Sequence, residues 1–247
     1  MIYTVTLNPS LDRTFGIDEF LYDEVNTIVE ERRRAEGRGI NVSRVIRELG
    51  GQSIALGFMG GYNGIEMEGR LTGEAVICDF TRTNGETRTN IIIHQGKKKV
   101  ETLLSAAAAE VTPFDVNVFY NKIRQIPRRS YVVVSGNMPP GLDDGFYAQM
   151  ITALNDRDAK VFLDTDGEAL RKGIRAGPYL AKPNIHEFGR LVEANLKDHY
   201  DVIAAAAPYL ELVDFLVVSM GRRGALGICD RERFLVTPPR VDVKSST

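Results

Sequence analysis

The sequence predicts a doubly wound α/β protein with a mostly parallel sheet, and three observations support this fold class. Short apolar runs rich in β-branched residues recur along the chain, and each leads toward a helix-like stretch or a turn. Continuous apolar strands are typical of parallel sheets that helices cover on both faces. The 247 residues are 43% hydrophobic and 26% charged, so the chain can bury a sizeable core.

The expected strands of the main sheet are apolar segments spread over most of the chain. They cover residues 2–7, 53–58, 131–134, 161–163 and 215–218. Helical patterns are expected at residues 40–49, about 145–154, 184–194 and 202–210. The first of these helices has apolar residues at helical spacing, and Gly50 and Gly51 mark its end.

Two stretches, at about residues 13–34 and 86–104, break this alternation. The second reads as two strands around a glycine turn, with no helix between them. We expect a small antiparallel β lid beside the main sheet, within a single domain of residues 1–247. An uncovered strand edge favours pairing with another chain, so we expect a homodimer through this lid. The alternative is a pair of ordinary surface hairpins.

The last part of the sequence lacks an element that the fold class requires. A strand-like run at residues 233–236 leads through two prolines to residues 241–247, without a helix to cover the last strands. We therefore expect that the C-terminal part of the domain is missing from this chain.

Composition and charge exclude several classes of partner. Lys and Arg total 31 against 33 Asp and Glu, so we expect no nucleic acid and no anionic membrane as partner. The sequence has no bilayer-spanning apolar run and no signal-type start. Cys78 and Cys229 lack CxxC partners, which argues against a zinc site and suits a reducing compartment. We expect a cytoplasmic protein.

Common catalytic motifs are absent from the sequence. It contains no GxxxxGK[ST], no GxGxxG after the first strand, no HExxH and no GxSxG. The three histidines show no ligand spacing. These absences exclude P-loop NTPases, dinucleotide-dependent oxidoreductases, zinc metalloproteases and serine hydrolases.

Two motifs near the N-terminus suit a polyol or an anion. The segment NPSLDR follows the first strand, where ligands of open α/β sheets bind, and Asp12 could accept hydrogen bonds from adjacent sugar hydroxyls or form an Asx-type turn. In the segment EGRGIN, Gly37 and Gly39 flank Arg38 at the start of a helix. This is either an anion pocket or a plain helix start with glycine as N-cap.

Two further motifs could contact a phosphorylated substrate. Arg88 in GETRTN lies at the start of a lid strand, where it could close over a phosphate or be solvated surface. Ser135 in SGNMPPG follows the expected strand 131–134 at a carboxyl edge. An ordinary turn with glycine and proline would explain the second motif equally well.

The later motifs suit a nucleotide. In KPNIHE, which begins at Lys182, Asn184 and Glu187 share a helix face and suit Mg²⁺, or they form a capping box, and the two roles are compatible. Ser219, Gly221 and Gly224 lie in a paired-glycine turn that could hold phosphates and ribose, although such turns between strands are common.

In this order the motifs resemble those of the ribokinase-like carbohydrate kinases, specifically the phosphofructokinase B family, over Met1 to Thr247. The segments that carry the resemblance are TLNPSLDR, GINVSRVIRELG, GFMGG, GETRTN, SGNMPPG, KPNIHEF and VSMGRRGAL. They are most similar to the branch of 1-phosphofructokinases and tagatose-6-phosphate kinases.

The resemblance implies an ATP- and Mg²⁺-dependent kinase with a role for each motif. The implied substrate-binding residues are Asp12, Gly37, Arg38, Gly39, Asn41, Arg88 and Ser135. The implied cofactor-binding residues are Lys182, Asn184, Glu187, Ser219, Gly221 and Gly224, with Asn184 and Glu187 holding Mg²⁺ through water. Arg38 stands where the family usually has Lys, which changes reach and donor geometry.

The family's general base is the Asp of a GAGD segment, which is expected directly after Thr247 and is absent. No catalytic residue is therefore identified, and we expect the chain as given to be inactive or severely impaired. The resemblance implies phosphorylation of a ketohexose monophosphate to the bisphosphate, with fructose 1-phosphate to fructose 1,6-bisphosphate as first choice. Tagatose-6-phosphate kinase and 6-phosphofructokinase are alternatives, and a non-catalytic sugar-phosphate binding protein is an alternative of another class.

Overall fold

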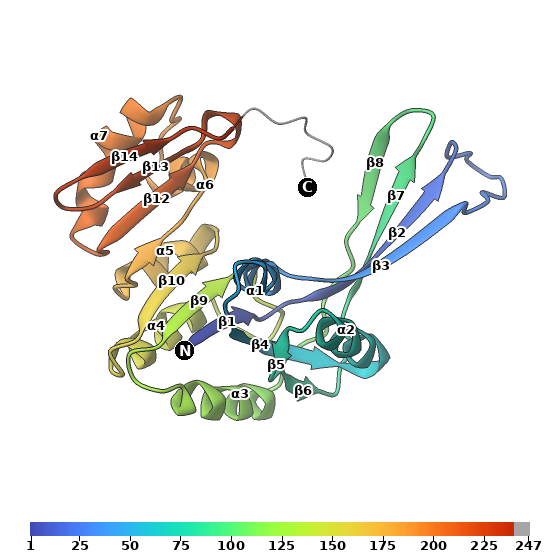
Figure 1. The fold of residues 1–247 in the computed structure, drawn as a ribbon, viewed down its shortest axis with the longest axis horizontal. Helices are drawn as coiled ribbons and strands as arrows, with labels where there is room; N and C mark the ends of the chain where they lie inside the picture. The colour runs from blue at the N-terminus through green and yellow to red at the C-terminus, as the bar shows by residue number, and fades with distance from the viewer. Residues whose placement is uncertain (240–247) are drawn as a thin grey trace. The chain divides into compact units, whose positions relative to one another are not determined.

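The computed structural model describes residues 1–239 (Figure 1). The chain divides into two compact units, Met1–Asp143 and Asp144–Thr247. Each unit contains a sheet with parallel strands and helices packed against it. Within residues 1–239 no helix is long and apolar enough to cross a membrane.

The main sheet of the first unit is parallel. Its centre is β1 (Ile2–Thr6), which pairs with β4 (Ser53–Gly60) on one side and β9 (Tyr131–Ser135) on the other. Beyond β4 lie the short strands β5 (Ile77–Cys78) and β6 (Thr81–Thr83). β1, β4 and β9 confirm the strands expected at residues 2–7, 53–58 and 131–134. Apolar runs rich in β-branched residues therefore predicted these strands correctly.

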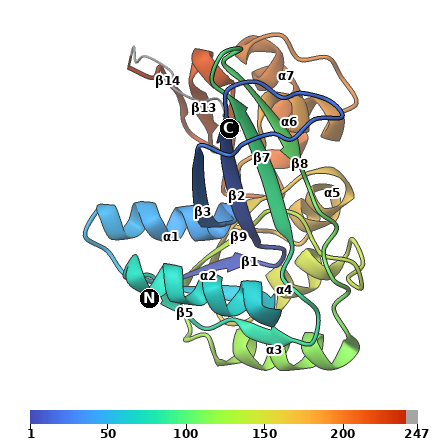
Figure 2. The same ribbon diagram turned by 90° about the vertical axis from the view of Figure 1, so that its right-hand side faces the viewer.

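Three helices cover this sheet (Figure 2). α1 (Arg38–Glu48) packs against β1 and β4, α2 (Gly61–Gly73) against β4 and β5, and α3 (Pro113–Gln125) against β6. α1 confirms the helix expected at residues 40–49, whereas α2 and α3 were not anticipated. The glycines of α2 obscure its helical pattern, because glycine is a poor helix former. α3 begins with a capping box and a proline, which are recognisable start signals.

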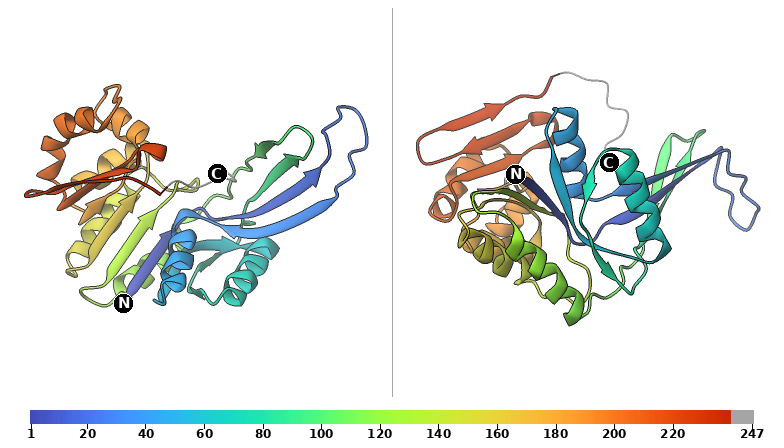
Figure 3. Two further views of the ribbon diagram at one scale, coloured as in Figure 1. Left: turned by 45° about the horizontal axis from the view of Figure 1, so that its top comes forward. Right: turned by 60° about the horizontal axis from the view of Figure 1, so that its bottom comes forward.

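A second sheet of the first unit contains β3 (Glu30–Glu36), β2 (Ser10–Ile17), β7 (Thr89–Gln95) and β8 (Val100–Leu104), in that order. It confirms the expectation of a separate small sheet. The outer pairs are antiparallel, while the two inner strands are parallel to each other. Figure 3 shows these strands extending together, in blue and green, to two turns at their far end.

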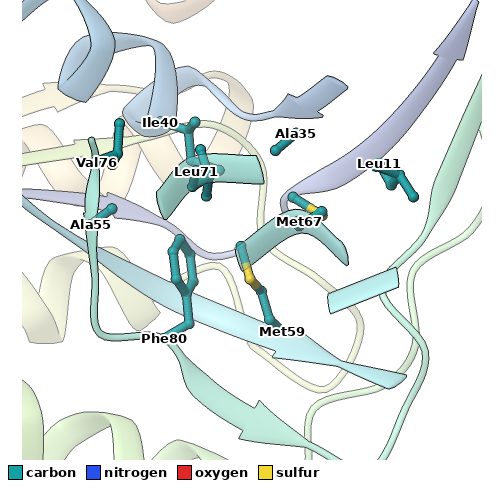
Figure 4. Close-up of a cluster of buried hydrophobic side chains, with 9 residues drawn as sticks. All are labelled: Leu11, Ala35, Ile40, Ala55, Met59, Met67, Leu71, Val76 and Phe80. Carbon is teal, nitrogen blue, oxygen red and sulfur yellow. The ribbon is translucent and has the colours of Figure 1, made fainter. Parts of the chain in front are cut away.

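A cluster of buried side chains joins the two sheets of the first unit (Figure 4). Leu11 from β2 and Ala35 from β3 pack with residues of α1, α2 and the main sheet. The other members are Ile40, Ala55, Met59, Met67, Leu71, Val76 and Phe80. Because full burial of one large apolar side chain contributes roughly 1.5–3 kcal/mol, this cluster anchors the base of the second sheet in the core.

Two arginines also hold the base of β3. Arg44 of α1 donates to the carbonyl of Ala35 at 2.6 Å, and Arg70 of α2 donates to the carbonyl of Arg33 at 3.0 Å. Arg44 is only 7% exposed, and its Nε lies 2.6 Å from a carboxylate oxygen of Glu74. Its buried charge is therefore paired, as burial of a charge requires.

The sheet of the second unit combines parallel and antiparallel strands. β10 (Lys160–Asp164), β11 (Leu180–Ala181) and β12 (Phe215–Ser219) are parallel. β13 (Ala225–Ile228) and β14 (Arg233–Val236) then add as an antiparallel hairpin. β10, β12 and β14 confirm three of the expected strands.

The helices of the second unit are α4 (Phe146–Asn155), α5 (Gly167–Arg175), α6 (Ile185–Leu191) and α7 (His199–Leu210). α5 was not anticipated, and α6 ends earlier than the helix expected at residues 184–194. The segment 241–247, on which the expectation of a missing C-terminal part rested, lies outside the described residues.

Both cysteines are free. Burial raises the pKa of the Cys78 thiol to about 11, with a smaller contribution from the Glu68 carboxylate. Cys78 packs against the core cluster. It therefore behaves as a small hydrophobic residue.

Candidate functional site

Asp12 lies in β2 and joins a hydrogen-bonded group with Ser10 and Asn90. One carboxylate oxygen accepts from the Ser10 hydroxyl at 2.7 Å and from the Asn90 amide at 2.9 Å. The same amide donates to Ser10 at 3.1 Å, and Asn90 is 7% exposed. The Asp12 side chain is thus held by a neighbouring strand and not by a local Asx turn. Asn90 stood in the quoted GETRTN motif, but sequence reasoning gave it no role.

Arg88 immediately precedes β7 and lies beside the Asp12 group. It donates to the Asn90 side chain at 3.3 Å, to Ser105 at 3.2 Å and to the carbonyl of Asn8 at 3.3 Å. Burial lowers the pKa of this guanidinium, while the Asp12 carboxylate acts in the opposite direction. Its Nε is buried and has no hydrogen-bond partner. Arg88 is therefore a partly desolvated cation with donor capacity to spare, and not a solvated surface residue.

The two glycines that flank Arg38 allow a close approach of α1 to β1. A Cβ on Gly37 would lie 2.5 Å from the Thr6 methyl group, and one on Gly39 would lie 2.7 Å from the Thr6 hydroxyl. That hydroxyl accepts from the Ile40 backbone N–H at 3.1 Å. Packing against β1 therefore accounts for both glycines, and the helix start with a glycine N-cap is confirmed. An anion pocket here stays a prediction.

Asn41 is exposed near the start of α1, one turn after Arg38, which is also exposed. The Asn41 amide nitrogen donates to Glu36 at 3.0 Å, and its oxygen accepts from Arg44 at 2.7 Å. Glu36 and Arg44 therefore fix the orientation of the Asn41 side-chain amide. Arg44 is a supporting residue that sequence reasoning missed, although it stands in the quoted GINVSR motif.

Ser135 ends β9 beside Thr6 at the end of β1. The residue is fully buried, and its hydroxyl has no hydrogen-bond partner. An unsatisfied buried hydroxyl costs roughly 1–3 kcal/mol. The carboxyl ends of these two parallel strands therefore present a buried polar atom with unused bonding capacity, at the edge where open α/β sheets bind ligands.

In the second unit, Asn184 and Glu187 form the capping box of α6. The Asn184 oxygen accepts from the backbone N–H groups of His186 and Glu187 at 2.9 Å, and the Glu187 carboxylate accepts from the Asn184 N–H at 2.7 Å. The capping-box prediction is therefore confirmed. Glu187 is 5% exposed. A carboxylate offers about four lone-pair positions, so capping leaves room for a water ligand.

The carboxylates that follow β10 are engaged by neighbouring cations. Asp164 lies 3.1 Å from the ammonium of Lys182, and Asp166 caps α5 and lies 2.5 Å from Arg190. Residues 1–239 contain no group of three His, Cys, Asp or Glu placed to hold a metal ion. These side chains could hold Mg²⁺ only in a site where water and phosphate oxygens supply most of the ligands. Glu187 would then contact the ion through a water molecule.

Ser219 ends β12 next to Asn184, with which it forms a parallel bridge. The predicted turn between two strands is confirmed, and it takes the form of a short 3₁₀ helix, Gly221–Arg223. Gly221 and Gly224 both have positive φ, and a Cβ on Gly224 would lie 1.8 Å from the carbonyl oxygen of Val236. The structure thus brings Ser219 and Asn184 together, and the hairpin itself requires Gly224.

All candidates for the sugar side lie in the first unit, and all candidates for the nucleotide side lie in the second. The catalytic base is not among them. The GAGD segment that was expected to carry it would follow Thr247, outside the described residues.

Comparisons with known proteins agree with the motifs. A sequence profile of the pfkB family carbohydrate kinases matches residues 6–247. The chain is 34% identical over 230 residues to a 1-phosphofructokinase of Borreliella burgdorferi, covering 92% of this chain and 74% of that one. It is 30% identical over 249 residues to a tagatose-6-phosphate kinase of Staphylococcus epidermidis, covering 98% and 79%.

The fold is similar to that of phosphofructokinase-2 from Escherichia coli, whose crystal structure was solved in complex with fructose-6-phosphate. The TM-score is 0.93 at 29% identity, over 99% of this chain and 82% of that one. This similarity confirms the α/β fold with a mostly parallel main sheet and a separate smaller sheet whose outer strand pairs are antiparallel.

Proposed function

We infer the substrate from one premise: the chain belongs to the pfkB family of carbohydrate kinases and is a sugar-phosphate kinase. Family membership implies ATP as the phosphate donor. The proposed reaction is the phosphorylation of a ketohexose monophosphate, with fructose 1-phosphate converted to fructose 1,6-bisphosphate.

The observation that carries this proposal is the pairing of Asp12 with Arg88 through Asn90. A carboxylate accepts hydrogen bonds from sugar hydroxyls, and a guanidinium binds phosphate with charge-assisted bonds. A sugar phosphate carries both groups. Because Arg88 is partly desolvated, its attraction for a phosphate is stronger than that of an exposed arginine.

The choice among sugars follows the relatives. Identity is 34% to the 1-phosphofructokinase of Borreliella burgdorferi and 30% to the tagatose-6-phosphate kinase of Staphylococcus epidermidis. This order favours fructose 1-phosphate, with tagatose 6-phosphate and fructose 6-phosphate as the next candidates.

The proposed roles assign positioning and charge neutralisation to this chain, which is most of what phosphoryl transfer requires of a protein. Asp12 orients the sugar through its remaining lone pairs, Arg88 neutralises the substrate phosphate, and Asn41 and Arg38 contact the sugar from α1. In the second unit Lys182, Asn184, Ser219 and the glycine turn hold the nucleotide. Mg²⁺, held through water by Asn184 and Glu187, would neutralise charge on the ATP phosphates.

We further propose that the protein acts in the cytoplasm as a homodimer joined through the second sheet of the first unit. β3 and β8 are the outer strands of that sheet, and every residue of β8 is exposed, including Val100, Leu103 and Leu104. A strand edge with apolar side chains of this kind favours association. Light scattering after size-exclusion chromatography should give twice the chain mass.

Titration calorimetry of this chain with the three ketohexose phosphates tests the substrate assignment. We expect the lowest Kd for fructose 1-phosphate, by at least about tenfold. ADP release should then be measured on a version extended after Thr247 by the corresponding segment of the Borreliella relative. Absence of binding to all three sugars would refute the proposal, whereas binding without turnover in the extended version would favour a sugar-phosphate binding protein.

A further inference from the structure

The start of α2 is capped by a carboxylate from a distant part of the chain. Its N-cap residue, Gly60, has no side chain with which to cap the helix. Instead, the backbone N–H groups of Tyr62 and Asn63 donate to the two carboxylate oxygens of Glu86, at 3.2 and 2.6 Å. The positive end of the helix dipole therefore binds an internal anion.

Gly61 makes room for this carboxylate. Its φ is +67°, and a Cβ there would lie 2.0 Å from a Glu86 oxygen. Any other residue at this position would displace Glu86 from the helix end.

The residues that follow Glu86 are tied to the same helix end. Gly60 and Thr87 exchange two bonds, one from the Thr87 N–H to the Gly60 carbonyl and one from the Gly60 N–H to the Thr87 hydroxyl, both at 2.9 Å. The Asn63 amide donates to the Thr87 carbonyl at 2.8 Å and to the Thr89 hydroxyl at 2.9 Å. Thr87 is 7% exposed.

Arg88 stands between the two threonines that α2 holds. Its own carbonyl also accepts from the Leu11 N–H at 2.9 Å. The backbone around Arg88 is thus fixed by short bonds, whereas the bonds of its guanidinium are 3.2–3.3 Å long. The tethered backbone therefore fixes the position from which the Arg88 side chain reaches these three acceptors.

We propose that Glu86 and Asn63 are positioning residues that place the Arg88 guanidinium for the phosphate of the sugar substrate. They determine how strongly the protein prefers a phosphorylated sugar over the same sugar without phosphate. This inference rests on the proposed function, in which Arg88 binds that phosphate, and adds two residues that touch no substrate atom.

The first test compares Asn63→Ala with Asn121→Ala, a matched control that removes an amide from α3. Calorimetry should show an increase of about tenfold in the Kd for fructose 1-phosphate in Asn63→Ala, because loss of the bonds to Thr87 and Thr89 loosens the segment that carries Arg88. The affinity for fructose should stay the same in both variants. An equal loss for both sugars would show a general structural role and overturn the proposal.

Double variants test whether Asn63 acts through Arg88. Adding Asn63→Ala to Arg88→Ala should have no further effect on the Kd for fructose 1-phosphate, because residues that act through one group are not additive. Additive losses would overturn the proposal. Glu86→Gln, which keeps the side-chain length and one acceptor, should give a smaller loss than Asn63→Ala and covers the case in which Asn63→Ala does not fold.

A readout without substrate separates this inference from the proposed function. Phenylglyoxal modifies accessible arginines, and mass spectrometry of the peptide that contains Arg88 follows the rate at that residue. We expect a severalfold faster reaction in Asn63→Ala and Glu86→Gln than in wild type. If wild type binds no ketohexose phosphate, the proposed function fails and the rate still decides the positioning. Unchanged modification rates at Arg88 in both variants would overturn the positioning role of Glu86 and Asn63.

Discussion

The two groups of candidate residues differ in how the chain holds them. On the sugar side, Asp12 bonds to Asn90 from 78 positions away, and Arg88 bonds to Asn8 from 80 positions away. On the nucleotide side, Asn184 and Glu187 are three positions apart and bond within one helical turn. The first arrangement exists only when the second sheet of the first unit has formed, whereas the second exists as soon as α6 does.

This difference means that the two sides should respond differently to substitution. Substitutions at the base of the second sheet should weaken sugar-phosphate binding even when the substituted residue is far from Asp12 and Arg88 in the sequence. Changes in the capping box of α6 should stay local. Variants on the two sides test this difference.

The largest effect is expected for Arg88→Ala. Loss of the charged donor should raise the Kd for fructose 1-phosphate by about 100-fold, since bonds to charged groups contribute most. The affinity for ATP should not change. Arg82→Ala removes an exposed arginine that pairs with Glu68 and provides the control. Calorimetry that shows the same loss in both variants would contradict a specific role for Arg88.

The second effect concerns Arg44, which holds the base of β3. Arg44→Met removes its bonds to the Ala35 carbonyl, Glu74 and Asn41, and should lower the free energy of unfolding by about 2 kcal/mol, as expected when hydrogen bonds from a charged group are lost. Asn41 also loses the partner that orients its amide, so the Kd for fructose 1-phosphate should rise.

Urea unfolding checks the stability, with Arg47→Ala as the control on the same helix. The Arg47 side chain is 40% exposed, so its removal should change the free energy of unfolding by about 0.5 kcal/mol or less. Similar losses in the two variants would show that Arg44 is not a special support of the sheet.

The same contrast explains what could be predicted from the sequence. The strands were found because β-branched runs are local signals, and the capping box at Asn184 was found because its spacing is a local rule. Asp12 and Arg88 were singled out by their positions beside expected strands, and the family resemblance then implied their roles. Glu86, Asn63 and Arg44 were missed because, apart from Asn41, their partners lie 9 to 30 positions away. No periodicity or spacing rule covers such contacts, and only the folded unit brings them together.

The helices that were missed have a related cause. α2 contains four glycines, which hide its helical pattern, and its N-terminus is capped by a residue outside the helix. α5 begins at Gly167 directly after the Asp166 cap, in a segment where no helix was expected. Both helices were missed because the residue that caps each one, Glu86 for α2 and Asp166 for α5, is not part of a repeating apolar pattern.

A smaller effect is expected for Asn184→Ala, on the nucleotide side. Loss of an N-cap should lower the free energy of unfolding by about 1 kcal/mol. The affinity for ATP should fall as well, and the affinity for fructose 1-phosphate should be unchanged. Asp198→Ala removes the matching cap of α7, which accepts from two backbone N–H groups, and should cost about as much stability without affecting ATP. If both variants bind ATP equally well, Asn184 is only a helix cap.

The smallest effect is expected for Glu66→Gln, which tests the ion pairs between α2 and the second sheet. Hydrogen bonds from Arg70 and attraction by Arg33 lower the pKa of the Glu66 carboxyl below its ordinary value of 4.5. The carboxylate therefore stabilises the folded state above that pH, by about 0.5 kcal/mol for a partly exposed pair.

This contribution should be lost as the pH falls through the lowered pKa of the folded state. Urea unfolding of wild type and Glu66→Gln should thus differ at pH 7 and converge toward pH 3. Because Glu66 connects α2 to β3 and not to Arg88, its loss should leave the Kd for fructose 1-phosphate unchanged. A rise in that Kd would show that the sugar side depends on the outer ion pairs too, and not only on the buried Arg44 and the bonds around Thr87.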